Sequence, residues 1–215
     1  MGNSIKSFEV NEETTVYDGF FKMTRLRLRH TLFRGGWSND LIRELFHRGA
    51  CVAVLPYDPV NDTVLLIEQF RVGALNFKAD PWLLEIVAGA VEEGESPQQV
   101  ARREAMEEAG CEINHLIQIA DFFTTPGAFG EKITLFCGIV ETPMRDGVHG
   151  LEEEGEDIRT SVVSFDEAWG MFENGSIDSA IPIIALQWLA MNRERLRAEF
   201  NGGWQETPCL NPCNR

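Results

Sequence analysis

The sequence predicts an α+β fold in which helices cover both faces of a mixed β-sheet, an α/β/α sandwich with an N-terminal β-rich appendage. Three observations lead to this fold class. Segments rich in β-branched and aromatic residues recur between residues 20 and 165, one strongly capped helix lies among them at 97–109, and helical segments close the chain. We divide the chain into the appendage, residues 1–45, and a main domain, residues 46–215.

The appendage contains a clear strand pattern. Within residues 20–33, the run from Arg25 to Arg29 alternates arginine with leucine, which is typical of a strand with one buried face. Residues 38–46 fit either a short helix or a strand, and both interpretations stay open at this point.

The main domain begins with a predicted hairpin. Two β-rich runs, residues 50–57 and 63–70, flank a turn that contains Asp58-Pro59 and Asn61-Asp62. Residues 81–89 are apolar enough for a buried strand that leads into the loop before residue 97. Further strands are predicted at 133–141 and 158–165.

Two helices follow the last strand. Asp166 is the expected N-cap of a short helix that ends near Gly175, and residues 180–200 predict a long helix. The apolar face of the long helix carries Ile184, Leu186, Trp188, Leu189 and Met191.

The central helix, 97–109, has signals at both ends. Ser96 is a preferred N-cap, Pro97 suits the first helical position, and Gln99 completes a capping box. Gly110 supplies the left-handed residue that commonly ends a helix.

Three carboxylates share one face of this helix, because Glu104 and Glu108 are one turn apart and Glu107 is three residues from Glu104. Their repulsion costs an isolated helix roughly a few tenths of a kcal/mol per pair. The face is therefore either a solvated acidic surface or a site for a hard divalent cation, since Mg²⁺ and Mn²⁺ prefer carboxylate oxygens.

The segment 89–111, GAVEEGESPQQVARREAMEEAGC, has the pattern G-x5-E-x7-R-E-U-x-E-E-x-G-U, where U is apolar. This pattern resembles the signature of the Nudix hydrolases, which cleave nucleoside diphosphates linked to another moiety. The resemblance implies a Nudix-type sandwich that uses Mg²⁺, or alternatively Mn²⁺. It implies that the metal is bound by Glu104, Glu107, Glu108 and the carbonyl of Ala88, and that the loop–helix geometry is fixed by Gly89, Glu95, Arg103 and Gly110.

Outside this segment, residues 17–200 resemble the ADP-ribose-hydrolysing members of the family. The pointers are Pro126, the acidic loop HGLEEEGEDI at 149–158, and the ending IDSAIPIIALQWL at 177–189. The resemblance implies that Glu154 is the general base and Glu156 a further metal ligand. Glu152 and Glu153 are alternatives for the base, and by composition alone the loop reads as a solvated acidic turn.

The same resemblance implies a set of substrate-binding residues. Arg71 matches a phosphate-contacting arginine. Arg43, Glu44 and Arg48 would line the adenosine and phosphate pocket. Phe20 and Phe21 would contact the adenine, and Thr125 and Glu131 would contact the terminal ribose. Without the family, the phenylalanines would read as core and the arginines as surface ion-pair partners.

The resemblance further implies a homodimer that exchanges its N-terminal segments, so that residues 1–45 are a dimerisation segment. The expected reaction is hydrolysis of ADP-ribose to AMP and ribose 5-phosphate. One alternative is the same chemistry on another sugar nucleotide, such as GDP-mannose or ADP-glucose. An alternative from another class is a non-catalytic Nudix sensor that binds ADP-ribose.

The composition limits the partners. A formal net charge of −15 argues against binding to nucleic acid or to an acidic membrane, since both need basic patches. The five cysteines form no disulfide or metal framework, and a zinc site at Cys209 and Cys213 is not expected. The first 25 residues lack an apolar signal core, so the expected location is the cytoplasm.

Overall fold

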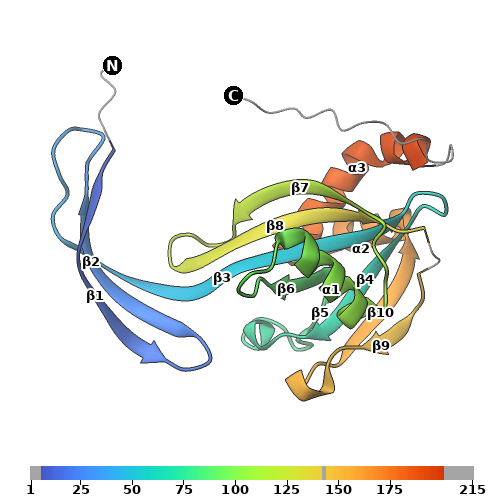
Figure 1. Ribbon diagram of the computed structural model, residues 1–215, viewed down its shortest axis with the longest axis horizontal. Helices are drawn as coiled ribbons and strands as arrows, with labels where there is room; N and C mark the ends of the chain where they lie inside the picture. Colours follow the sequence, from blue (N-terminus) through green and yellow to red (C-terminus); the bar gives the residue numbers. More distant parts are fainter. Residues whose placement is uncertain (1–5, 142–143, 201–215) are drawn as a thin grey trace.

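Strand β3 (Leu41–Asp58) joins the two parts of the molecule in the computed structural model, which describes residues 6–141 and 144–200. The first half of β3 pairs antiparallel with β2 (Lys22–His30), and its second half pairs parallel with β8 (Phe129–Ile139). A single strand therefore runs from an N-terminal arm into the main body (Figure 1). The predicted α+β class is confirmed.

The arm consists of β1 (Phe8–Asp18), β2 and the first half of β3. The strand expected within residues 20–33 is confirmed, and the ambiguous segment 38–46 enters β3 as strand. Strand β1 was not predicted. Every one of its residues is exposed, so it lacks the apolar alternation that marks a half-buried strand.

The body completes a mixed ten-stranded sheet around β3. Its remaining strands are β4 (Thr63–Phe70), β5 (Trp82–Glu85), β6 (Val87–Ala90), β7 (His115–Phe123), β9 (Gly147–His149) and β10 (Ile158–Ser164). The expected single strand at 81–89 is wrong in one respect, because it is divided at Ile86. The part before Ile86 pairs with β4 and the part after it pairs with β3.

Helices lie on both faces of the sheet. Helix α1 (Pro97–Ala109) buries Val100, Ala101 and Ala105 against one face. Helix α3 (Ala180–Phe200) packs on the other face together with the shorter α2 (Phe165–Glu173). The two buried clusters stay separate because alternate side chains of β3 and β4 point to opposite faces.

Helix α2 corrects one expectation. Its N-cap is Ser164, not Asp166, because the Ser164 side chain accepts the Glu167 N–H while the Glu167 side chain accepts the Ser164 N–H. Asp166 lies in the first turn instead, where its carboxylate accepts a hydrogen bond from Arg193 at 2.8 Å.

The turn between β3 and β4 is connected to α3 through Asp62, which has a positive φ of 57°. Its carboxylate accepts hydrogen bonds from Tyr57, Arg193 and Arg197, and we call these four residues the Asp62 cluster. Burial alone would raise the pKa of Asp62, but the hydrogen bonds from Arg193 and Tyr57 lower it. The cluster holds α3 against the hairpin of β3 and β4.

In the described part of the chain, no helix is long and apolar enough to cross a membrane. Cys209 and Cys213, at which no zinc site was expected, lie outside the described residues.

Candidate active site

Helix α1 is held at both ends by the signals found in the sequence. Ser96 accepts the Gln99 N–H, and the Gln99 side chain accepts the Ser96 N–H, which forms a capping box. Gly110 is left-handed, with φ 54°, and the following N–H of Cys111 bonds to the carbonyl of Ala105. These caps fix the direction in which the acidic face of α1 points.

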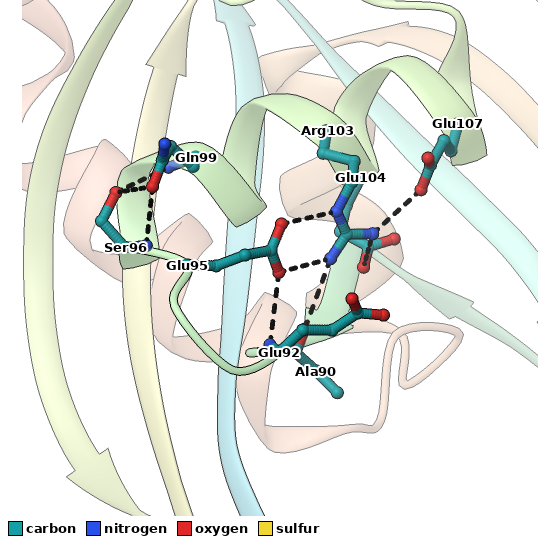
Figure 2. Close-up of polar contacts among 8 residues, drawn as sticks. All are labelled: Ala90, Glu92, Glu95, Ser96, Gln99, Arg103, Glu104 and Glu107. Atoms are coloured by element: carbon teal, nitrogen blue, oxygen red, sulfur yellow. Dashed lines mark hydrogen bonds and ion pairs between the residues drawn. The ribbon is translucent and has the colours of Figure 1, made fainter.

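Arg103 connects the acidic residues of this segment (Figure 2). Its guanidinium donates to both oxygens of Glu95, at 3.0 and 3.1 Å. It also donates to Glu104 at 2.8 Å and to Glu107 at 3.0 Å. The bidentate pair with Glu95 lowers the pKa of that carboxyl and clamps the loop before α1 onto the helix.

Strand β6 passes close to α1 at Gly89, where a larger residue would displace the carboxylate of Glu104. A Cβ added to Gly89 would lie 1.7 Å from Oε1 of Glu104. The neighbouring N–H of Ala88 donates to Oε2 of Glu108 at 3.0 Å. The backbone of β6 thus forms a close-fitting wall beside the two carboxylates of α1.

These carboxylates lie in an environment that disfavours their charged form. Burial, together with the nearby carboxylates Glu104 and Glu156, raises the pKa of Glu108 to about 8, although the hydrogen bond from the Ala88 N–H acts to lower it. Burial also raises the pKa of Glu104. The buried Glu108 and the half-buried Glu104 match the donor set of a hard divalent cation, which would offset their charge.

The acidic side chains of this region are not arranged as a complete coordination shell. Among residues 6–141 and 144–200, no three acidic, histidine or cysteine side chains converge as ligands of one ion. Glu104 and Glu107 are engaged by Arg103, and Glu156 accepts the N–H of Leu151 at 3.1 Å. The donor set therefore fits a metal in its chemistry, and the ligands would gather when the metal binds.

The acidic loop lies next to α1. The Gly150 N–H donates to the carbonyl of Glu107 at 3.3 Å, and a Cβ on Gly150 would lie 2.7 Å from that of Glu156. Residues Glu152–Glu154 form a short 3₁₀ turn, η2, between Gly150 and Glu156. The side chain of Glu154 lies outside the described part of the structure.

Arg71 brings a cation into the region of Glu108. It follows the end of β4, and its Nε lies 2.6 Å from Oε2 of Glu85. Its charge acts to lower the pKa of Glu108, which places the two side chains in the same neighbourhood.

A second polar group forms around Glu131 at the start of β8. One carboxylate oxygen accepts the hydroxyl of Thr124 at 2.7 Å, and the other lies 3.8 Å from Arg48 Nε. The Cys51 thiol also faces this carboxylate, at 3.8 Å. Thr125 reaches the group through the hydroxyl of Thr124, at 3.5 Å. Burial and the charges of Glu131 and Glu104 raise the pKa of Cys51, whereas Arg48 lowers it.

Four aromatic rings run from the arm towards the body. Neighbouring ring centroids in the series Phe20, Phe21, Phe46 and Phe129 are 4.7, 4.9 and 5.0 Å apart. The Arg48 guanidinium lies 5.6 Å from the Phe21 ring centroid. Phe20 is 93% exposed, so it is available to another molecule rather than buried in a core.

The remaining two candidates lie on the arm, which stands apart from α1 within one chain (Figure 1). Arg43 donates to the carbonyl of Ile42, and Glu44 pairs with Arg25 at 3.0 Å. Both side chains are exposed.

Sequence reasoning missed several residues of this region. Glu85 and Thr124 were not singled out, although they hold Arg71 and Glu131. The polar Glu85 in the middle of the otherwise apolar run 81–89 was the available signal. Its pairing with Arg71 depends on strand register, which the sequence does not display.

Comparison with known proteins gives a consistent result. The model of the NUDIX domain matches residues 47–184. An ADP-ribose pyrophosphatase of Escherichia coli strain K12 is 45% identical over 192 residues, which cover 89% of this chain and 92% of the relative. An ADP-ribose pyrophosphatase of Haemophilus influenzae is 43% identical over 200 residues, 92% of each chain.

A more distant relative and a solved structure are also similar to this chain. A GDP-mannose pyrophosphatase of Pectobacterium atrosepticum is 33% identical over 147 residues, which cover 68% of this chain and 75% of the relative. Among solved structures, the crystal structure of an ADP compounds hydrolase matches with a TM-score of 0.69 and 22% identity. That match covers 93% of this chain and 99% of the other, and it supports the fold described above.

Proposed function

This chain belongs to the NUDIX family, and we propose that it is a metal-dependent hydrolase that splits the diphosphate of ADP-ribose into AMP and ribose 5-phosphate. One observation carries the proposal. The closely fitted carboxylates Glu104 and Glu108 lie in a chain that is 45% identical, over 89% of its length, to an ADP-ribose pyrophosphatase.

We assign the metal site to the acidic face of α1. Glu104, Glu107 and Glu108 would hold Mg²⁺, or Mn²⁺ in its place, together with Glu156 and the carbonyl of Ala88. The buried position of Glu108 and its contact with the Ala88 N–H support this assignment. Such an ion neutralises charge on a diphosphate and makes a water molecule a better nucleophile.

The remaining roles belong to protein side chains. Glu154, on the acidic loop beside α1, would accept the proton of the attacking water as general base. Arg71 would bind a phosphate oxygen, because its guanidinium is the cation that acts on Glu108. Gly89, Glu95, Arg103 and Gly110 keep the loop and α1 in position, as their contacts indicate.

The nucleoside side of the substrate would lie towards the arm. Phe20 and Phe21 offer aromatic faces for the adenine, and stacking of this kind contributes roughly 1–3 kcal/mol. Arg43, Glu44 and Arg48 would line the adenosine and phosphate pocket. Thr125 and Glu131 would contact the terminal ribose. A hydrogen bond from the Thr124 hydroxyl orients the Glu131 carboxylate.

We further propose a homodimer with exchanged arms. Every residue of β1 is exposed, and so are several large apolar side chains nearby, namely Phe8, Phe20, Phe33 and Ile42. These observations support a dimer, because such an apolar surface is normally covered by a partner. Residues 1–45 would then act as the dimerisation segment, and residues 46–215 as the hydrolase domain. A cytoplasmic location is consistent with the free thiols of Cys51, Cys111 and Cys137.

The test is release of AMP from ADP-ribose with saturating Mg²⁺, measured for the wild type and for Glu108→Gln. Turnover in the wild type and its loss in the variant are expected. GDP-mannose is assayed in parallel, since one relative carries that name. Faster hydrolysis of GDP-mannose or ADP-glucose would replace the proposed substrate. ADP-ribose binding without turnover of any of the three would indicate a sensor.

A further inference from the structure

Gln69, near the end of β4, carries a buried amide group without a partner. The residue is 8% exposed, and its Nε2 atom has no hydrogen-bond acceptor in the described part of the molecule. Buried donors are nearly always paired in folded proteins, and an exception calls for an explanation. The amide therefore points to an acceptor that arrives from outside the free chain.

The strand geometry shows the face on which this amide lies. Leu65 and Ile67, four and two residues before Gln69, both pack in the cluster beneath α1. The register between β4 and β5 is continuous from Ile67↔Glu85 to Phe70↔Trp82, without a bulge. Because alternate residues of a strand share a face, Gln69 also projects to the α1 side of the sheet.

The neighbours of Gln69 belong to the candidate active site. Arg71 has extended backbone angles, φ −125° and ψ 110°, so it continues the alternation and shares the same face. Arg71 pairs with Glu85 and acts electrostatically on Glu108. On the other side of β4, Glu68 pairs with Arg159, which places Ile158 next to Gln69 at the end of the acidic loop.

We propose that Gln69 is a further substrate-binding residue, whose Nε2 donates a hydrogen bond to a non-bridging oxygen of the ADP-ribose diphosphate. Residues two apart on a strand are about 6.6–6.8 Å apart, so Gln69 and Arg71 can reach oxygens on the two phosphorus atoms. An uncharged donor suits the face of the sheet that also carries Glu85, because it binds an anion without neutralising that carboxylate. This inference rests on the proposed function.

Gln69→Leu tests it, because leucine has a similar volume and lacks the donor. We expect kcat/KM for ADP-ribose to fall by about tenfold to a hundredfold, the range for a lost hydrogen bond to a charged oxygen. This fall should appear as a higher KM together with a lower kcat. The melting temperature should stay equal or rise, since an unpaired buried amide has been removed. If the substitution merely destabilised the fold around the active site, both kcat/KM and the melting temperature would fall instead.

Ser179 provides the matched control, because its Oγ is the other buried side-chain atom without a partner in the described residues and it lies just before α3. Ser179→Ala should be equally stable or more stable and should keep wild-type kinetics. Should Gln69→Leu not fold, Gln69→Met carries the same test with a more flexible side chain.

The outcomes separate this inference from the proposed function. Absence of ADP-ribose turnover in the wild type overturns the proposed function and the inference with it. Wild-type turnover with unchanged kinetics in Gln69→Leu overturns the inference alone. A fall in kcat at constant KM also overturns it, because the amide would then act on the acidic loop rather than on the substrate.

Discussion

The Glu108 carboxyl links the chemistry of the site to the stability of the fold. Burial raises its pKa to about 8 from an ordinary 4.5, so the folded protein holds this proton more tightly than the unfolded chain does. Between those two pH values the unfolded chain loses the proton first. The stability of the metal-free protein should therefore fall as pH rises from about 4.5 to about 8.

Glu108→Gln should remove this pH dependence. Glutamine keeps the shape and can still accept the Ala88 N–H, but it does not ionise. One pKa unit is worth about 1.4 kcal/mol, and 1 kcal/mol shifts the melting temperature of a chain of this size by about 2–4 °C. The rise in pKa from 4.5 to about 8 corresponds to roughly 5 kcal/mol. We therefore expect the metal-free variant to melt on the order of 10 °C higher than the wild type at pH 9, with no difference at pH 4.

Thermal melts in a chelating buffer across this pH range would measure the effect. Glu112→Gln is the control, because Glu112 is exposed beyond the end of α1. Parallel curves for the wild type and Glu108→Gln would show that burial does not hold the proton on this group.

At the scale of elements, two helices carry the same N-terminal motif with different consequences. Ser96 with Gln99 caps α1, and Ser164 with Glu167 caps α2. Replacing either serine by alanine should lower the free energy of unfolding by about 1 kcal/mol. Only Ser96→Ala should also raise the Mg²⁺ concentration needed for half-maximal activity, because α1 carries the carboxylates.

Urea denaturation and a Mg²⁺ titration of initial rates measure the two effects. Ser164→Ala serves as the stability-matched control, since α2 lies on the other face of the sheet. An equal change of the metal requirement in both variants would show that general loosening, rather than the position of α1, controls the site.

The elements that the sequence predicted best are those with local signals. Helix α1 begins and ends at the residues expected from Ser96 and Gly110, and β4 has the bounds of its apolar run, because capping and burial are encoded nearby. Strand β7 was missed. It contains a bulge between Gln118 and Ala120, which breaks the two-residue alternation.

The candidate site also has a part that local sequence signals predict and a part that they do not. Its acidic helix is one contiguous segment, so spacing alone placed Glu104, Glu107 and Glu108 on one face. The pairs Arg71–Glu85 and Thr124–Glu131 join residues from different strands or from the two sides of a loop. Such contacts depend on register and loop conformation, and local patterns do not specify either.

At the scale of the whole molecule, exchange of the arms makes a prediction about mixed dimers. A chain with Glu108→Gln has a defective body and an intact arm, and a chain with Phe20→Ala and Phe21→Ala has the reverse. If each arm serves the partner's body, every mixed dimer contains one site without either defect. An equal mixture with random pairing should then recover about a quarter of wild-type activity.

The measurement is the rate of AMP release after the two variants are mixed and allowed to re-associate. The reference is the sum of their separate rates, and a chain with both defects mixed with Glu108→Gln is the negative control. Activity equal to that sum would mean that each arm serves the body of its own chain.

The Asp62 cluster has a consequence for the order of events during synthesis. Asp62 and Arg193 are separated by 131 residues, yet they bond directly, and Arg197 lies further still along the chain. At a translation rate of about 5–20 residues per second, the hairpin waits roughly 7–26 seconds for α3. The apolar side chains that α3 covers, including Leu55 and Leu66, stay open for that interval. The nascent chain therefore completes this core only after α3 has left the ribosome.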